Sequence, residues 1–217
     1  MPYFLTLALL LALVQPARAA DNAKLPAAEL FSMAAALDKL PAGQRDAFGL
    51  RHRIWSKQAG KPLSVWYEDQ GQKIEIPLRA DGSFDRPAAL ARPGFNPMLM
   101  ASQPEAGVEL SIDLLAQVAD SRELHYADLM RSVTQMNAFI KSQAGLMSLF
   151  APTVHSLHFR CQPQAECALT AHLPEGPKTY VPDASGRITL KLSKALMKAN
   201  PRLSGKTPFA EIVGDME

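Results

Sequence analysis

Hydrophobic and polar residues alternate along two stretches of the chain, and this alternation predicts β-strands. In the first stretch the predicted strands cover residues 62–67, 73–78, 98–101 and 108–112. In the second they cover residues 157–159, 167–172, 178–181, 188–192 and 209–213. Turns such as Ala80-Asp81-Gly82-Ser83, with its Asp-Gly pair, separate the strands and predict antiparallel hairpins. Each stretch also contains a short helical segment, one ending at Leu90 and one over residues 193–199.

Two other segments repeat their apolar residues at helical spacing. The segment between the β-rich stretches forms one apolar face from Tyr126, Leu129, Met130, Val133, Met136, Phe139 and Ile140. Asp120 and Glu123 have the spacing of a capping box at its start. Met130, Met136 and Met147 would make an adaptable groove if exposed, but packing in the core is the favoured interpretation. A shorter helix is predicted from Pro26 to Leu40, with Pro41 ending it.

The two β-rich stretches resemble each other weakly. With an offset of 104 residues and no gap, eight of the 51 positions from Ile54 to Pro104 are identical. The matches include Gly82 with Gly186 and the pair Asn96-Pro97 with Asn200-Pro201. Trp55 falls on Phe159, and Cys161 falls on Lys57. The pattern predicts an internal duplication, with chance similarity as the alternative.

The elements together predict an α+β protein with two similar antiparallel β-rich modules, joined by an amphipathic helical connector and preceded by an N-terminal helix. The predicted boundaries are a signal peptide (1–19), an N-terminal helical segment (20–50), the first repeat (51–112), the connector (113–153) and the second repeat (154–217). The two repeats form either one domain or two.

Residues 1–19 have the pattern of an export signal. Residues 4–14 are an uncharged apolar run, and Ala17-Arg18-Ala19 supplies the small residues that a signal peptidase needs, so cleavage is expected after Ala19. The run is too short to span a bilayer, and no second apolar run approaches membrane length. We therefore expect a periplasmic or secreted protein without a transmembrane span once the signal is removed.

Charge narrows the choice of partners. The chain carries 23 Lys and Arg against 21 Asp and Glu, a net charge of +2. A nucleic-acid binder must neutralise many phosphates, so this balance argues against nucleic acid as a partner.

The chain has two cysteines, Cys161 and Cys167. In an oxidising compartment such a pair is expected to form a disulfide. The alternative is a metal or redox site with His155 and His158, but in a strand these two histidines point to opposite faces. The disulfide is therefore the favoured interpretation, and no metal site or cofactor is predicted.

The clearest surface feature is basic. Six cations occur at intervals of three or four residues with no acid between them: Arg187, Lys191, Lys194, Lys198, Arg202 and Lys206. They would attract an anionic envelope surface, either lipid headgroups or acidic polysaccharide, or they would form an ordinary solvated face.

Two weaker candidates remain. Trp66 and Tyr67 must point to opposite faces of their strand, which leaves Trp66 as a possible exposed ring for stacking on a sugar or an apolar partner. Packing of both rings is the alternative. Asp81, Asp85 and Asp183 lie in turns without the alternating ligands of a calcium loop, so turn formation explains them better.

The unit from Ala80-Asp81-Gly82-Ser83-Phe84 to Asn96-Pro97 resembles uncharacterised secreted bacterial proteins classed as domains of unknown function. The resemblance implies no activity, site or cofactor.

The chain contains no nucleophile elbow, phosphate-binding loop or zinc-protease motif. The predicted function is therefore non-enzymatic binding, of an envelope protein or an anionic envelope surface. The alternative is a hydrolase acting on an envelope component, with its site at the seam between the two repeats, where a histidine with a carboxylate partner would be required.

Overall fold

A computed structural model of the protein describes residues 21–162 and 166–216, so the predicted signal peptide at residues 1–19 lies outside the described residues. The fold is mixed α+β, as predicted, and its strands form three antiparallel sheets. No helix in these two described ranges is both long and apolar enough to cross a membrane.

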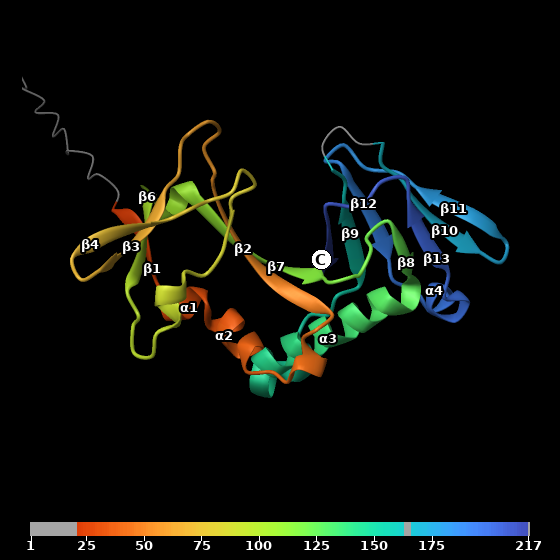
Figure 1. Ribbon diagram of the computed structural model, residues 1–217, viewed down its shortest axis with the longest axis horizontal. Coiled ribbons are helices and arrows are strands. Elements are labelled where there is room, and N and C mark those ends of the chain that lie inside the picture. The colour runs from red at the N-terminus through yellow and green to blue at the C-terminus, as the bar shows by residue number, and fades with distance from the viewer. Residues whose placement is uncertain (1–20, 163–165, 217) are drawn as a thin grey trace, which may run out of the picture.

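Two four-stranded sheets lie at opposite ends of the molecule, at the left and right of Figure 1. In spatial order, the first contains β1 (Asn22–Pro26), β6 (Met98–Pro104), β3 (Val65–Asp69) and β4 (Gln72–Ile76). The second contains β11 (Gly176–Tyr180), β10 (Leu169–Leu173), β13 (Arg202–Gly205) and β8 (Glu123–His125). We call residues 22–116 the first lobe and residues 123–215 the second lobe.

A six-stranded central sheet connects the lobes. Its order is β12 (Arg187–Lys191), β9 (Ser156–Arg160), β14 (Glu211–Asp215), β7 (Val108–Ala116), β2 (Phe48–Ser56) and β5 (Ser83–Phe84). Strands β2 and β7 pair along nine residues each. The two lobes meet between β7 and β14, whose register contains one residue pair, Leu115 opposite Val213. We call this junction the seam.

Helices lie along one side of the molecule, at the bottom of Figure 1. They are α1 (Ala27–Leu30), α2 (Ser32–Asp38), α3 (Tyr126–Ala144) and α4 (Lys194–Ala199). Within the described residues there are also four 3₁₀ turns: η1 (Ala42–Gln44), η2 (Ala88–Ala91), η3 (Glu105–Gly107) and η4 (Gly145–Phe150).

The N-terminal region differs from the single helix expected over Pro26 to Leu40. Strand β1 precedes it, and two short helices meet at Phe31. The physical reason is that the segment serves two cores. Leu30 and Phe31 are buried in the core of the first lobe, whereas Leu37 packs against the core of the second. A single straight helix would not place both groups correctly.

The long helix α3 confirms the predicted apolar face, since every residue of that face is buried except the half-buried Met130. The expected capping box is wrong, because strand β8 occupies residues 123–125 and the helix begins at Tyr126. Its first turn is capped from far along the chain, where Asn200 Oδ1 accepts a hydrogen bond of 2.9 Å from Ala127 N. Met147 is 62% exposed on η4, so its expected place in the core is also wrong.

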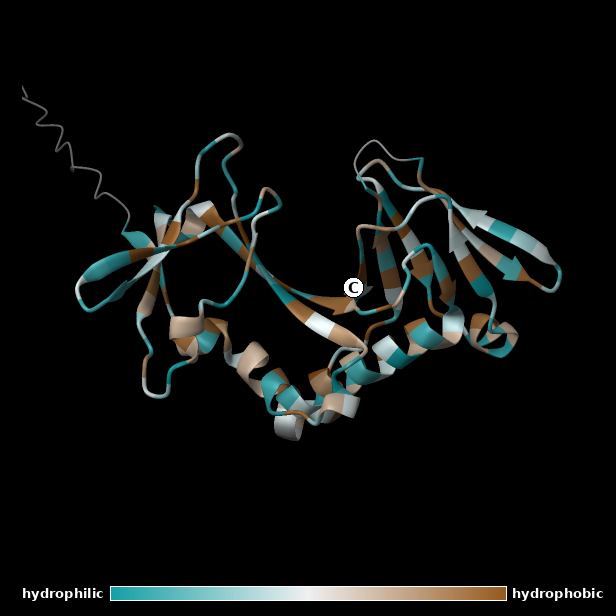
Figure 2. Ribbon diagram, in the orientation of Figure 1, coloured by the Kyte–Doolittle hydropathy of each residue, from teal (hydrophilic) through white to brown (hydrophobic). Residues whose placement is uncertain are grey.

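The apolar interior divides into two clusters. The first lobe buries a small cluster that includes Phe31, Val65, Tyr67 and Phe84. The larger cluster lies mainly in the second lobe, where Phe159 and Leu169 are fully covered, and it extends across the seam to Phe48 and Leu114 of the first lobe. Figure 2 shows hydrophobic positions alternating with hydrophilic ones along β9 and β12, whereas β11 at the edge is mostly hydrophilic.

The two lobes share several local contacts at an offset of 104 residues. Val65 lies opposite Ile76 and Ala101, and Leu169 lies opposite Tyr180 and Gly205. In one turn Arg79 N donates to Ser83 O at 2.8 Å, and in the other Asp183 N donates to Arg187 O at 2.8 Å.

Both turns also place a glycine at positive φ, 76° at Gly82 and 75° at Gly186. At Gly82 a Cβ atom would lie 2.4 Å from the Ile54 carbonyl oxygen, so only glycine fits there.

Each lobe also caps a helix with an Asn-Pro pair. In the first lobe Asn96 Oδ1 accepts from Ala28 N at 2.7 Å, and Pro97 O accepts from Ala27 N at 2.9 Å. Asn200 and Pro201 make the corresponding contacts to the start of α3. Strands β1 and β8, which precede these helices and were not predicted, thereby take equivalent edge positions.

Candidate functional site

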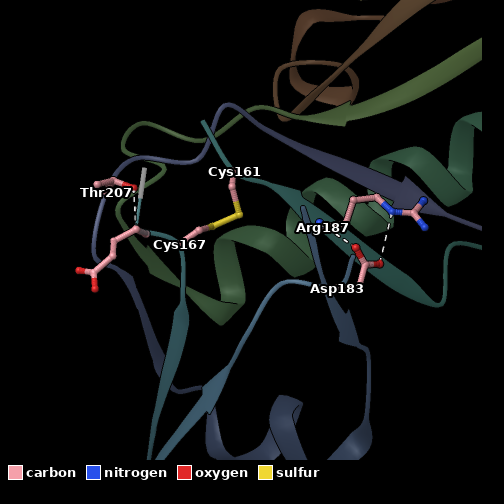
Figure 3. The surroundings of a disulfide bond; sticks show 6 residues. Cys161, Cys167, Asp183, Arg187 and Thr207 are labelled. Atoms are coloured by element: carbon pink, nitrogen blue, oxygen red, sulfur yellow. Dashed lines mark hydrogen bonds and ion pairs between the residues drawn. A yellow bond between two sulfur atoms is a disulfide. The ribbon is translucent and has the colours of Figure 1, made fainter. Parts of the chain in front are cut away.

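The cysteine pair forms a disulfide, as predicted. Cys161 and Cys167 have Cα atoms 5.8 Å apart and link the end of β9 to the start of β10 (Figure 3). Glu166, beside Cys167, accepts a hydrogen bond of 3.4 Å from Thr207 Oγ1 through its carbonyl oxygen. Both cysteines pack against the core of the second lobe. The bridge therefore lies against that core and ties β9 to β10.

The six predicted cations fall into two groups. Three of them have an acidic partner: Arg187 with Asp183 at 3.7 Å, Arg202 with Glu123 at 3.3 Å and Lys206 with Glu166 at 2.9 Å. The other three, Lys191, Lys194 and Lys198, are exposed and form no ion pair within the described residues. The surface that could attract an anion is therefore smaller than the predicted stripe.

Two of the unpaired lysines, Lys191 and Lys198, border a pocket of about 850 Å³ in volume. It lies between the β10–β11 hairpin, β12 and α4, and Lys191 and Lys198 line it. Lys178 on β11 adds a third ammonium group, while Glu175 is the one acid among the lining residues. We call this the lysine pocket.

The floor of the lysine pocket is apolar. Leu173, Ala195 and Leu196 contribute aliphatic surface, and Tyr180 contributes an aromatic ring. Lys178 Nζ lies 5.1 Å from the centre of that ring. The pocket thus combines positive charge with an apolar surface, which suits an anion that also has an apolar part.

Sequence reasoning missed Lys178 and Tyr180. They lie at least seven residues before the basic stripe, on a separate strand, and only the folding of β11 beside β12 brings them near Lys191. The one available signal was the alternation Lys178-Thr179-Tyr180 in a predicted strand, which places both side chains on one face.

Trp66 is half-buried on the first lobe, and Tyr67, its neighbour, is buried in the core at 3% exposure. Lys73 Nζ lies 4.5 Å from the centre of the Trp66 ring. The ring is therefore on the outer face of the sheet but partly covered by a cation. Its use in binding remains a prediction.

A second polar cluster crosses the seam on the open face of the central sheet. Arg51 of β2 forms ion pairs with Asp113 of β7, at 2.6 Å, and with Glu211 of β14. Arg160 Nε lies 2.9 Å from Glu211 Oε1, an ion pair whose geometry is not that of a hydrogen bond. The side chains of Arg51, Asp113 and Glu211 are 13–15% exposed. This network, which we call the seam network, links strands of both lobes by charge.

The pKa values around the seam follow from these contacts. Burial raises the pKa of Asp81, but hydrogen bonds from Ser83 and the charges of Arg51 and Arg53 outweigh burial and lower it below its ordinary value. Burial, followed by the repulsion of Arg53, lowers the pKa of Arg160. Each buried charge of the seam network therefore has a partner of opposite charge, as is typical of an ion-pair network that stabilises a fold.

A histidine with a carboxylate partner is present near the seam, as the hydrolase alternative requires. His158 Nε2 lies 3.4 Å from Asp215 Oδ2, and Ser156 Oγ donates to the same carboxylate oxygen. In a catalytic triad the imidazole lies between the hydroxyl and the carboxylate. Here the carboxylate lies between the two, so the serine proton goes to Asp215 and His158 cannot accept it.

No group of three His, Cys, Asp or Glu residues is arranged to hold a metal ion in the parts of the chain that the structure describes.

Comparison with known proteins adds no assignment: no family model matches the chain, and no match was found among curated proteins or solved structures.

Proposed function

We propose that this is an exported, non-enzymatic binding protein that attaches to an anionic surface of the cell envelope through the lysine pocket. The observation that carries the proposal is the set of three lysines, Lys178, Lys191 and Lys198, around one apolar-floored pocket. Their excess over Glu175 leaves a local positive charge without a counterion from the described protein.

Export to an oxidising compartment is part of this proposal. The Cys161–Cys167 disulfide supports it, because such bonds persist mainly outside the cytosol. The apolar run and small-residue pattern at residues 1–19 support it independently.

The shape of the pocket favours lipid headgroups over a soluble polyanion. The apolar floor with Tyr180 gives room for acyl or glycerol groups, while the lysine ammonium groups stand at exposed positions suited to phosphates. Electrostatic attraction of this kind is worth about 1 kcal/mol per cation near an anionic membrane. Three lysines therefore give weak, salt-sensitive attachment.

The test is sedimentation of the protein lacking residues 1–19 with vesicles of phosphatidylglycerol in phosphatidylcholine. Retention is expected to fall when anionic lipid is omitted, and to fall again in the double variant Lys191→Glu/Lys198→Glu. The matched control is Lys39→Glu/Lys57→Glu, which makes the same charge change on exposed lysines of the other lobe. Equal loss of retention in both double variants would show that net charge alone drives binding and would refute the proposed site.

A soluble acidic polysaccharide such as alginate provides the second arm. Binding of alginate but not of the anionic vesicles, with the same dependence on Lys191 and Lys198, would transfer the proposal from lipid to polysaccharide. Absence of binding to either would overturn it.

The hydrolase alternative rests on the His158–Asp215 pair near the seam. The arrangement of Ser156 and His158 on one carboxylate favours a structural use of the pair, so we propose binding as the function.

We also propose that the two lobes arose by internal duplication. The shared strand order, turns and Asn-Pro caps support it. Strand pairing gives a different alignment of β2 with β9 from the offset of 104 residues. Phe84 and Ile188 correspond at that offset, and their partners across the sheet are His52 and Phe159. Phe159 then corresponds to His52 instead of Trp55, and Cys161 corresponds to Ile54 instead of Lys57.

A further inference from the structure

The first lobe contains an apolar cavity of about 280 Å³ between its four-stranded sheet and the central sheet. Aliphatic and aromatic side chains from both sheets line it, together with Leu30 of α1. The main lining residues are Leu25, Ile54, Val65, Phe84, Leu99 and Ala101. We call this the first-lobe cavity.

The corresponding region of the second lobe is filled by the protein itself. Phe209 is 5% exposed and packs edge-on against Phe159, with ring centres 5.0 Å apart. Its ring also takes the space beside Gly205, where a Cβ atom would lie 2.9 Å from the Phe209 Cε2 atom. Gly205 lies opposite Leu169 as Ala101 lies opposite Val65, so the two positions are equivalent in the sheets.

In the first lobe the position equivalent to Phe209 is not a phenylalanine. Phe209 lies four residues after Gly205, and the residue four after the equivalent Ala101 is Glu105. Phe209 also lies three residues before Ile212, the partner of Phe159. The residue three before Ile112, the partner of His52, is Glu109. Both glutamates are exposed. A carboxylate cannot enter an apolar cavity without a large desolvation cost, so the space stays open.

We propose that the first-lobe cavity is a binding site for a phenyl-sized apolar group, a ring that takes the place Phe209 has in the second lobe. An apolar cavity of about 150 Å³ lined by Leu, Ile and Phe already binds benzene, so 280 Å³ accommodates a substituted ring. The lining offers dispersion contacts from both sheets and few polar groups, which selects for a neutral ring.

The cavity opens to solvent beside Leu110, which is 40% exposed and forms part of its lining. Lys24 and Glu105, both exposed, stand at the same opening. A polar substituent on the ring would remain at this mouth, in water and near both charges. The site therefore suits a phenol, whose hydroxyl would lie at the mouth, or a phenylalanine side chain whose polar backbone would lie there.

The experiment titrates the protein lacking residues 1–19 with p-cresol and, separately, with N-acetylphenylalanine amide. Methyl NMR of the leucine and valine side chains follows the binding, and thermal unfolding gives an independent reading. We expect saturable shifts of the Leu25, Val65 and Leu99 methyl signals and a rise in Tm of about 3 °C at ten times the dissociation constant. Binding of p-cresol alone identifies free small aromatics as the ligand class, and binding of the amide as well extends the site to peptide side chains.

Two variants locate the site. Ala101→Phe places a ring in the cavity from its own wall, and Leu110→Trp closes the mouth from a half-exposed position that does not endanger folding. Both are expected to abolish the methyl shifts and the rise in Tm. The control Leu149→Trp adds the same side chain at a position that is 90% exposed on η4 and should bind like the wild type. No saturable shift with either probe, or undiminished binding in Leu110→Trp, would overturn the proposal.

Discussion

The two lobes have the same order of strands but different interiors. The second lobe is filled by Phe159 and Phe209 and closed by a disulfide, and its residues Leu169, Ile188 and Leu203 are fully buried. The first lobe has a smaller core, an open cavity and a buried histidine, His52, in place of an apolar residue. One arrangement of strands thus gives either a stable core or a cavity, according to a few side chains.

This difference separates the two candidate sites physically. The second lobe presents its lysine pocket on a rigid, well-packed body, while the first lobe keeps apolar volume accessible at some cost in stability. The lobes are joined by the seam network and by apolar packing, since Phe48 and Leu114 of the first lobe belong to the same buried cluster as Phe159 of the second.

The largest loss of stability is expected when a buried ring is removed from the core of the second lobe. Phe209→Ala removes a buried ring and should lower the free energy of unfolding by about 3–5 kcal/mol. Urea denaturation followed by circular dichroism measures it. Phe150→Ala is the control, since that ring is 79% exposed and its removal should change stability by less than about 0.5 kcal/mol. A similar small loss in both variants would show that the second lobe is not the better-packed one.

The next largest loss of stability is expected when the seam network is broken. Arg51→Met leaves Asp113 and Glu211 without the cation they share, and we expect a loss of about 2–3 kcal/mol. Calorimetry should also show whether the two lobes then unfold in separate transitions. Arg86→Met is the comparison, because its partner Asp38 is 54% exposed and an exposed pair contributes at most about 1 kcal/mol. A single sharp transition with unchanged Tm in Arg51→Met would contradict the linking role.

Removal of the disulfide should cost less. Cys161→Ser/Cys167→Ser opens a short loop, and the lost loop-closure entropy corresponds to about 2 kcal/mol. The decrease in Tm should match that of the wild type under reducing conditions. If reduction leaves the Tm of the wild type unchanged, the bridge does not stabilise the second lobe.

The smallest effect concerns pH and the first lobe. Burial lowers the pKa of His52 below its ordinary value of 6.5, helped by the charge of Arg86 and opposed by a backbone contact to Leu30. The unfolded chain therefore binds a proton more readily than the folded one. Stability is complete above pH 6.5 and decreases as the pH falls below it, by less than about 1.4 kcal/mol per pH unit.

His52→Leu should flatten this part of the stability curve between pH 7 and pH 5 without affecting the disulfide or the lysine pocket. Urea midpoints at several pH values provide the measurement. A wild-type curve parallel to that of His52→Leu would exclude His52 as the source of the acid sensitivity.

The sequence predicted the α+β class, most strands of both lobes and the apolar face of α3 because each depends on local periodicity. Strand β2 was missed, although it alternates, because His52 occupies an inward position and the arginines hide the pattern. Strands β1 and β8 were missed because they are short edge strands whose partners lie far away in the chain. The same distance hid the cap of α3, which Asn200 supplies.

The candidate sites show the same limit. Sequence alone located the disulfide and the basic stripe because a cysteine pair and a run of cations are local features. Which lysines are free of acids, and which residues face them across the lysine pocket, depended on the packing of β11, β12 and α4.

What the sequence determined by itself was therefore the alternation that makes strands, the helical face of α3 and the pairing of its two cysteines. Only the tertiary structure decided that one lobe is filled and the other is open. The physical reason is that side-chain volume acts between residues distant in the chain: Phe209 fills the space beside Gly205 in the second lobe, and the positions equivalent to Phe209 in the first lobe, Glu105 or Glu109, carry no ring.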